Sequence, residues 1–285
     1  MRKLRIAILI FFCAAAVFFA YTRIRERMTT DYRAPVIQAD SDVLEVSVSA
    51  GDEELLAGMT AYDNLDGDVT DTLVVASRGK FSSKGTLHVN YAAFDKNRNV
   101  GVYSREVIFT DYVSPHFRMD APLRFASGGS VPDYLEHITA QDCLDGNITQ
   151  QIKITAGRTV AVSDTVTRQT MNLQVTNSCG DSAVLELTAS MEDYTTLNRP
   201  APALRDYILY AEKNGELDLR GNLTGIWTGG SVHSFEEMEF DPEVDVTVDE
   251  DALDYRTPGA YTVVYRLSRD GVELGSAELI VVVEE

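Results

Sequence analysis

The sequence predicts an all-β protein in which about three small β-sandwich modules follow a single N-terminal transmembrane helix. An Asp-Gly turn occurs twice, as AYDNLDGDVT at 61–70 and as AQDCLDGNIT at 140–149. A motif that returns after about 80 residues indicates a duplicated module of that size. Between the turns, apolar and polar residues alternate, as they do in half-buried strands. An uncharged apolar run near the N-terminus predicts the helix.

The apolar run covers residues 6–22 (IAILIFFCAAAVFFAYT), and basic residues flank it on both sides. Its length is near the lower limit of the roughly 17 to 25 residues of a membrane span. A cleaved signal peptide is the alternative, since Ala14–Ala16 would suit a cleavage site. The run continues past these alanines, which favours an uncleaved anchor. We therefore expect a cytoplasmic basic end at 1–5, a transmembrane signal-anchor at 6–22 and a juxtamembrane linker at 23–33.

The chain beyond the apolar run is strongly acidic. The whole sequence has 44 Asp and Glu residues against 25 Lys and Arg, and its net charge is -19. Such a surface repels nucleic acid and anionic lipid, and it attracts cations. We therefore expect a single-pass protein of the cell membrane with its C-terminal ectodomain outside, and no nucleic-acid partner.

Proline landmarks divide this acidic part into three modules. Asp-Tyr pairs precede a small residue and proline at Ala34-Pro35, Ser114-Pro115 and Ala201-Pro202. Proline cannot donate a ladder hydrogen bond, so it suits a first edge strand or a linker. The landmarks predict modules at 34–112, 113–196 and 200–285.

Strands are clearest in the second half of each module. Alternation over 86–92 and over 261–267 predicts half-buried antiparallel strands, and Gly85 and Gly259 precede them at turns. Closing strands are expected at 105–110 and 277–283.

The Asp-Gly turn, followed by a strand of the form GTxxVxYxAxDxxxN and a closing strand, resembles the bacterial immunoglobulin-like domains that repeat in Gram-positive surface proteins, including the pesticidal-crystal-protein type. The first module carries nearly the whole pattern and departs at Arg98, where that family usually has glycine. The second module keeps Asp142, Asp145 and Gly146, and the third keeps only 257–265. The resemblance implies an Ig-like sandwich fold and a surface setting, with functions that are diverse and mostly structural or adhesive.

Two cysteines lie beyond the apolar run, and both belong to the second module. When the first two modules are aligned, Cys143 falls on Asn64 and Cys179 falls on Asn97. We expect a Cys143–Cys179 disulfide, worth about 3 to 4 kcal/mol in the chain-entropy model. Two buried thiols are the alternative.

The first Asp-Gly turn has two interpretations. Carboxylates at Asp63, Asp66 and Asp68, with Asp95 and Asn97 from a later loop expected at the same end of the sandwich, would supply oxygen ligands for calcium. Alternatively, the aspartates accept backbone N–H bonds while a glycine with positive φ closes the turn. The spacing is not that of an EF-hand, so both interpretations stay open.

Other residues give little sign of chemistry. Trp227 is the only tryptophan, and it would either stack on a sugar ring or pack in the core. The four histidines are scattered, and the sequence has neither a His-Glu-x-x-His nor a Gly-x-Ser-x-Gly motif. The sequence therefore predicts a protein that is not an enzyme.

The three modules differ most in their end loops, which are acidic in the first, cysteine-bearing in the second and rich in glycine in the third. A pure spacer gains from uniform modules, so this divergence favours binding or adhesion to a glycan, a wall polymer or a surface protein through the sandwich-end loops. The third module is the best candidate because modules stacked end to end would put it farthest from the anchor. A structural stalk or an assembly subunit that binds no ligand of its own is the alternative.

Overall fold

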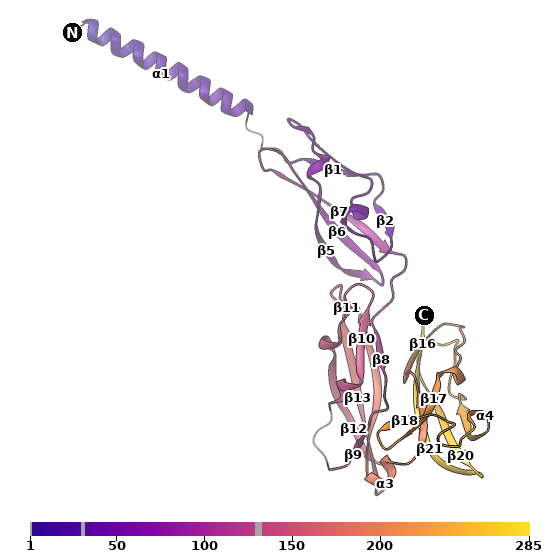
Figure 1. Ribbon diagram of the computed structural model, residues 1–285. Coiled ribbons are helices and arrows are strands. Elements are labelled where there is room, and N and C mark those ends of the chain that lie inside the picture. Colours follow the sequence, from indigo (N-terminus) through magenta and orange to yellow (C-terminus); the bar gives the residue numbers. More distant parts are fainter. Residues whose placement is uncertain (1, 30–31, 129–132) are drawn as a thin grey trace. The chain divides into compact units, whose positions relative to one another are not determined.

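The computed structural model describes residues 2–29, 32–128 and 133–285. The chain divides into two compact units, Met1–Tyr112 and Val113–Glu285 (Figure 1).

The first unit begins with helix α1 (Arg2–Thr29), whose apolar side chains from Ile8 to Ile24 are exposed. Its window Ile8–Arg25 is long and apolar enough to cross a membrane, although a signal sequence has the same properties. The predicted apolar helix is confirmed. Whether it anchors the chain or is cleaved stays a prediction.

The first sandwich consists of two facing sheets. One has the order β1-β3-β4, with β1 at Val36–Ala39, β3 at Met59–Asp63 and β4 at Gly67–Asp68. The other has the order β2-β7-β6-β5, with β2 at Val43–Val46, β7 at Val100–Phe109, β6 at Thr86–Phe94 and β5 at Val74–Ser83. Short helical turns α2 (Asp52–Leu55) and η1 (Thr70–Thr72) connect them.

The second sandwich repeats this plan. Its sheets are β11-β10-β8 and β12-β13-β14-β9. The bounds are β8 His116–Met119, β9 Arg124–Ala126, β10 Ile138–Asp142, β11 Gly146–Asn147, β12 Lys153–Ala161, β13 Val166–Thr176 and β14 Ser182–Glu192, with 3-10 turns η2 (Tyr134–Glu136) and η3 (Thr149–Gln151).

The third sandwich has the same plan again, with sheets β15-β17-β18 and β16-β21-β20-β19. The bounds are β15 Ala201–Leu204, β16 Ile208–Glu212, β17 Leu223–Thr228, β18 Ser231–His233, β19 Val246–Asp249, β20 Gly259–Arg269 and β21 Val272–Glu284, with η4 at Arg220–Asn222. In every sandwich one edge strand runs parallel to the closing strand, in the pairs β2/β7, β9/β14 and β16/β21. Three Ig-like sandwiches behind an apolar helix confirm the predicted fold class.

The strand predictions hold in detail where alternation was strong. In β6 the inward residues Leu87, Val89 and Tyr91 have no exposed surface. Near residue 244, valines alternate with polar residues as they would in a strand, but strand β19 covers only Val246–Asp249. Pro242 and the Asp241 side chain, which accepts from the Glu243 N–H at 2.9 Å, begin the helical turn α4 (Pro242–Asp245) instead, and β19 starts only afterwards.

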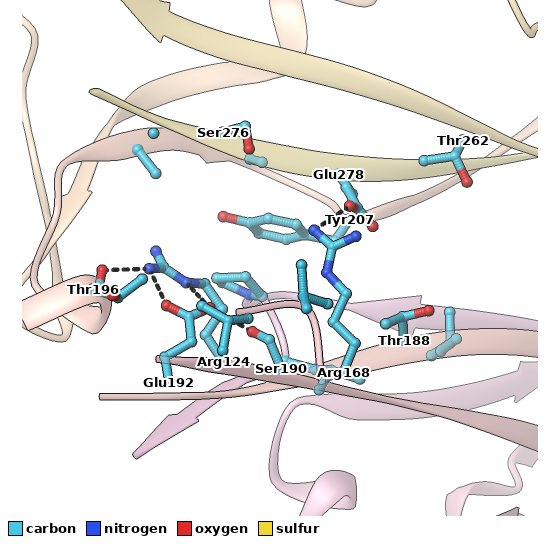
Figure 2. A pocket seen from close by; sticks show the side chains of 18 of the residues that line it. Arg124, Arg168, Thr188, Ser190, Glu192, Thr196, Tyr207, Thr262, Ser276 and Glu278 are labelled. Atoms are coloured by element: carbon cyan, nitrogen blue, oxygen red, sulfur yellow. Dashed lines mark hydrogen bonds and ion pairs between the residues drawn. The ribbon is translucent and has the colours of Figure 1, made fainter. Parts of the chain in front are cut away.

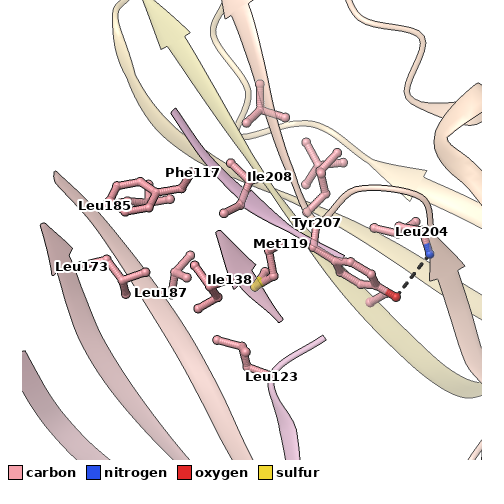
Figure 3. Packing of buried hydrophobic residues seen from close by; sticks show 14 of the residues in the cluster. Phe117, Met119, Leu123, Ile138, Leu173, Leu185, Leu187, Leu204, Tyr207 and Ile208 are labelled. Carbon is pink, nitrogen blue, oxygen red and sulfur yellow. Dashed lines mark hydrogen bonds between the residues drawn. The ribbon is translucent and has the colours of Figure 1, made fainter. Parts of the chain in front are cut away.

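The second and third sandwiches share one hydrophobic core. Buried side chains form a continuous cluster that runs from Phe117 and Met119 in β8 to Tyr207 and Ile208 around the start of β16 (Figure 3). The Tyr207 N–H also donates to the Met119 carbonyl at 2.8 Å. Separating the two sandwiches would expose the side chains at this junction to water, which is unfavourable.

The chain reverses direction between these two sandwiches. Asp193 caps the short helix α3 (Tyr194–Leu197) by accepting from the Thr196 N–H at 2.8 Å, and the third sandwich then lies beside the second (Figure 1). At the other end, Glu284 of β21 contacts His116 of β8 at 3.1 Å. The second and third sandwiches are therefore not stacked end to end, which is the condition under which the third would lie farthest from the anchor.

Candidate functional sites: an acidic loop cluster and a cleft between sandwiches

Three carboxylates meet at one end of the first sandwich. Asp63 ends β3, Asp66 lies in the turn to β4, and Asp95 begins the loop between β6 and β7. One oxygen from each lies within 4.8 Å of the others, and Asp63 and Asp95 are only 1% and 7% exposed. The structure thus brings together three of the five residues that the sequence predicted as calcium ligands.

Hydrogen bonds fix the turn that carries two of these carboxylates. Asp63 Oδ1 accepts from the backbone N–H groups of Leu65 and Asp66, at 2.8 and 2.9 Å. Gly67 follows with φ of 77°, a conformation that glycine adopts at little cost. Asp66 in turn accepts from the Lys96 N–H at 2.9 Å, and the Lys96 ammonium lies 3.1 Å from its other oxygen. The capping bonds that the second interpretation requires are therefore present beside the cluster.

The third carboxylate is held by its own loop, and the remaining two predicted ligands lie outside the cluster. Asp95 accepts from the backbone and side-chain amides of Asn99 at 2.7 and 2.6 Å. Asp68 accepts from the Thr70 N–H at 3.0 Å, and hydrogen bonds from the Thr70 side chain and backbone hold the pKa of this exposed carboxyl below its usual value. Asn97 is exposed.

The second sandwich has the same turn with a different partner. Asp142 Oδ1 accepts from the Leu144 and Asp145 N–H groups, both at 2.9 Å, as Asp63 does in the first sandwich. The position of Asp95 is taken by Asn177, whose side-chain amide donates to Asp142 Oδ2 at 3.1 Å. Its carbonyl oxygen accepts from the Asp181 N–H at 3.0 Å. A buried carboxylate and an amide here replace a buried pair of carboxylates.

The predicted Cys143–Cys179 disulfide is not supported, because the described cysteines form no disulfide. The Cys143 thiol instead donates to the Val113 carbonyl at 3.1 Å. The two loops are joined by other means, since Ser178 donates to Asp145 through its N–H at 2.5 Å and its hydroxyl at 2.7 Å. These hydrogen bonds join the two loops that the aligned cysteine positions suggested would be joined by a disulfide.

Trp227 lies in β17 and is half-buried. It pairs in register with Ala201 on one side and with Val232 on the other. Trp227 is therefore neither a fully buried core residue nor a fully exposed platform for a sugar ring. A ligand contact at Trp227 stays a prediction.

A cleft of about 440 Å³ lies between the second and third sandwiches. One wall is the outward face of β14, and the opposite wall is the outward face of β21 (Figure 2). Successive side chains of a strand point to opposite faces, so each wall presents every second residue of its strand. The polar residues with which these two strands line the cleft are Glu186, Thr188, Ser190 and Glu192 on β14 and Glu273, Ser276 and Glu278 on β21.

One ion pair is nearly buried at the inner end of the cleft. Arg124 donates to both oxygens of Glu192, at 3.0 and 2.6 Å, and to the Thr196 carbonyl at 3.0 Å. The Ser190 hydroxyl also donates to Glu192 at 2.5 Å. Burial alone would raise the pKa of the Glu192 carboxyl, but the bonds from Arg124 and Ser190 outweigh it and leave that pKa below its usual value. Glu192 is therefore ionised at neutral pH.

A second ion pair crosses the cleft. Arg168 of β13 lies 3.1 Å from Glu278 of β21, and both side chains are partly exposed (Figure 2). An exposed pair is worth little because water competes for both charges. A ligand can therefore separate these two groups at small cost.

Sequence reasoning did not find this cleft. Its walls come from strands far apart in the chain, and only the reversal at α3 brings them together. Along β14, alternating polar residues form the same pattern as any strand face in contact with water. The composition of this strand face is ordinary, so no local sequence pattern distinguishes the wall of the cleft from any other exposed face.

No protein-family model matches the sequence, and a search of curated proteins found no match. Among solved structures, the chain is similar to CBM51-2 in complex with GlcNAc and INT domains from Clostridium perfringens ZmpB, with 15% identity and a TM-score of 0.22. That match covers 55% of this chain and only 41% of the other. A match to human CDH23 EC21-23 has 13% identity and a TM-score of 0.21, and it covers 88% of this chain and 100% of the other. A match to the protocadherin gammaB7 EC3-6 cis-dimer structure has 10% identity and a TM-score of 0.21, with 88% and 74% covered. At these scores the likenesses carry no argument about ligands.

Proposed function

We propose that the chain is a membrane-anchored extracytoplasmic surface protein that binds a polar ligand in the cleft between its second and third sandwiches. The cleft is the observation that carries the proposal. Its volume falls in the range of roughly 300 to 1,000 Å³ that is typical of ligand pockets. The helix α1 supplies the anchor and the acidic sandwiches form the ectodomain.

The lining of the cleft favours a glycan, a wall polymer or a polar segment of a surface protein. Hydroxyl groups from Thr188, Ser190 and Ser276 lie between the charged groups of the two walls (Figure 2). Hydroxyls, guanidinium groups and carboxylates together donate to and accept from the hydroxyls of a sugar or the amides of a peptide. The Arg168–Glu278 pair is the part of the lining best able to exchange its partner for a ligand.

We propose binding rather than catalysis. A carboxyl that acts as a general acid needs a raised pKa, whereas the pKa of Glu192 is lowered by its bonds to Arg124 and Ser190. Its bidentate contact with Arg124 is the arrangement of a structural ion pair.

We infer that the sandwiches are of the bacterial immunoglobulin-like type found in Gram-positive surface proteins, including the pesticidal-crystal-protein type. The turn at 61–70 and its copy at 140–149 support this inference. A non-binding stalk or assembly subunit is the alternative, and the shared core of the second and third sandwiches is the feature that would suit it.

The test uses the full chain in nanodiscs, incubated with peptidoglycan, with peptidoglycan that carries its wall polymers, and with a glycan array. Thr188→Trp places a large ring in the cleft from an exposed position, so it fills the cleft without disturbing the core. We expect it to weaken binding at least about tenfold, as a blocked pocket should. Arg168→Ala should weaken it less, and Arg158→Ala, at an exposed position of β12 outside the lining, should leave it unchanged.

Three results would contradict the proposal. If Thr188→Trp bound like the wild type, the ligand would lie elsewhere. If only Trp227→Ala lost binding, the end loop of the third sandwich would be the site. If no probe bound the wild type, the stalk or assembly function would take precedence.

A further inference from the structure

Exposed apolar side chains gather at one end of the first sandwich. They surround the acidic turn and lie on both sheets. We call them the apolar collar: Val36, Tyr62, Leu65, Val74, Phe94, Val100 and Val102, with exposed fractions from 40% to 77%. Soluble surfaces carry single exposed apolar residues routinely, but a gathered set marks a contact surface.

The strand register shows how the collar is assembled. Val36 pairs with Tyr62 across β1 and β3, and Phe94 pairs with Val100 across β6 and β7. Directly opposed residues on neighbouring strands place their side chains on the same face. Leu65 lies at the tip of the turn between β3 and β4. The collar therefore includes the outer faces of both sheets and the loop between β3 and β4.

The second sandwich acts as an internal control, because it has the same register with different residues. Its pairs His116–Gln141 and Thr176–Ser182 replace Val36–Tyr62 and Phe94–Val100. In the same way Lys153 replaces Val74 at the start of the strand that pairs with β13. Only Leu65 and Val102 have apolar counterparts, Leu144 and Val184. The fold accepts polar residues at most of these positions, so folding alone does not explain the apolar ones.

The covalent chain restricts what can contact the collar. Helix α1 ends at Thr29 and β1 begins at Val36, so only residues 30–35 connect them. A link of this length spans at most roughly 25 Å when fully extended. The Pro35 carbonyl packs so closely on Gly101 that a Cβ there would overlap it, which fixes the end of the link against β7. A bilayer that holds α1 therefore lies within reach of this end of the sandwich.

We propose that the apolar collar rests in the interfacial region of the phospholipid bilayer that α1 crosses. The inference rests on the anchoring in the proposed function. Tyrosine is enriched at the headgroup level, and Tyr32 and Tyr62, 82% and 65% exposed, lie on the link and in the collar. Leu65 and the valines bury apolar surface among the acyl chains near the headgroups. The Lys96 side chain is paired with Asp66 but is 80% exposed, so its ammonium can also contact lipid phosphates.

Fluorescence quenching tests the contact with the full chain in phosphatidylcholine nanodiscs that contain lipids brominated on their acyl chains. Leu65→Trp puts a reporter in the collar, and Leu144→Trp puts one at the matching turn of the second sandwich. Trp227, the natural tryptophan, gives the baseline in the wild type. We expect brominated lipid to lower the added emission of Leu65→Trp by at least about a third and to leave that of Leu144→Trp unchanged.

Two controls separate the collar from the anchor. Phe19→Trp, in the apolar run of α1, is quenched whenever the helix spans the bilayer. If Phe19→Trp is not quenched, or if alkaline carbonate extracts the chain from vesicles, the anchoring itself fails. If Phe19→Trp is quenched and Leu65→Trp is not, the collar proposal alone is overturned.

A graft from the second sandwich sharpens the test. The changes Tyr62→Gln, Phe94→Thr and Val100→Ser give the collar the residues that its copy carries at positions already exposed, so the core is untouched. In the Leu65→Trp background we expect the graft to abolish most of the quenching. Quenching that survives the graft unchanged would show that the tether alone brings the turn to the lipid, and it would overturn the proposal.

Discussion

The acidic turns of the first and second sandwiches have the same pattern of backbone hydrogen bonds, which we call the frame. They place their carboxylates differently. In both, an aspartate at the end of the strand accepts two N–H bonds within the turn. In the first, the facing loop has Asp95 followed by Asn99, and in the second it has Asn177 followed by Asp181. The carboxylate and the amide have exchanged positions between the two loops, so the net charge of the loop is the same. The second sandwich, however, has no counterpart of the buried carboxylate pair Asp63 and Asp95.

This exchange separates the structural role of the turn from its electrostatic role. The buried aspartate of the frame is needed wherever the turn occurs, because it satisfies N–H groups that would otherwise lose their partners. The second carboxylate is not needed for the frame, since Asn177 fills that position and donates to Asp142 directly. Among the residues that the structure describes, the group of three carboxylates close enough to share a metal ion lies in the first sandwich, with the Lys96 ammonium beside it. Any cation requirement should therefore be confined to the first sandwich.

The largest expected effect comes from removing the frame aspartate. We expect Asp63→Ala and Asp142→Ala each to lower the free energy of unfolding of their own unit by about 3 kcal/mol, because two N–H groups lose a charged acceptor. Hydrogen exchange of β6 and β13 amides under native conditions measures each unit separately. Asp68→Ala, at an exposed carboxyl, is the control and should cost much less. Strongly unequal costs at positions 63 and 142 would show that the two frames are not equivalent.

The next effect concerns calcium. If the carboxylates bind calcium, a free calcium concentration of 100 times the Kd should raise the free energy of unfolding of the first unit by about 2.7 kcal/mol. A chelator should remove this gain. The paired change Asp95→Asn and Asn99→Asp copies the arrangement of the second sandwich and keeps the net charge. We expect it to abolish the response to calcium, measured as a shift in Tm.

The reverse exchange, Asn177→Asp with Asp181→Asn, is the matched control in the second unit. It removes the amide that donates to Asp142 and should destabilise that unit in chelator. If calcium leaves the wild-type Tm unchanged, the turn is a capping structure alone and the calcium prediction is wrong.

The repeats predicted the fold well, because a strand pattern and a turn are local signals. The alternation around Leu87, Val89 and Tyr91 and the duplicated turn were sufficient to predict all-β modules and the convergence of Asp63 with Asp95. Local pattern could not predict which groups the turn would use to link its loops. A cysteine pair suggested a disulfide where Ser178 and Asp145 supply hydrogen bonds.

The packing of the second sandwich against the third could not be predicted from the sequence for a different reason. The side-by-side arrangement of the second and third sandwiches depends on the reversal at α3 and on apolar residues such as Met119 and Tyr207, which any single sandwich would also bury. The cleft depends on the same reversal, so it could not be inferred before the arrangement was known. The apolar collar, by contrast, was present in the sequence as a difference between two aligned modules, at positions such as Tyr62 and Gln141.

The smallest expected effect tests a single backbone position in the two loops. Arg98 has φ of 70°, and its counterpart Gly180 has φ of 93°. A side chain in the left-handed region costs roughly 1 to 2 kcal/mol, and glycine loses part of that gain through its greater freedom in the unfolded chain. We expect Arg98→Gly to stabilise the first unit by about 0.5 kcal/mol in the same exchange experiment. Arg98→Ala removes the guanidinium and keeps the strain, so it should give no gain. An equal gain from both variants would assign the effect to the arginine side chain, and the φ of this residue would then not distinguish the two turns.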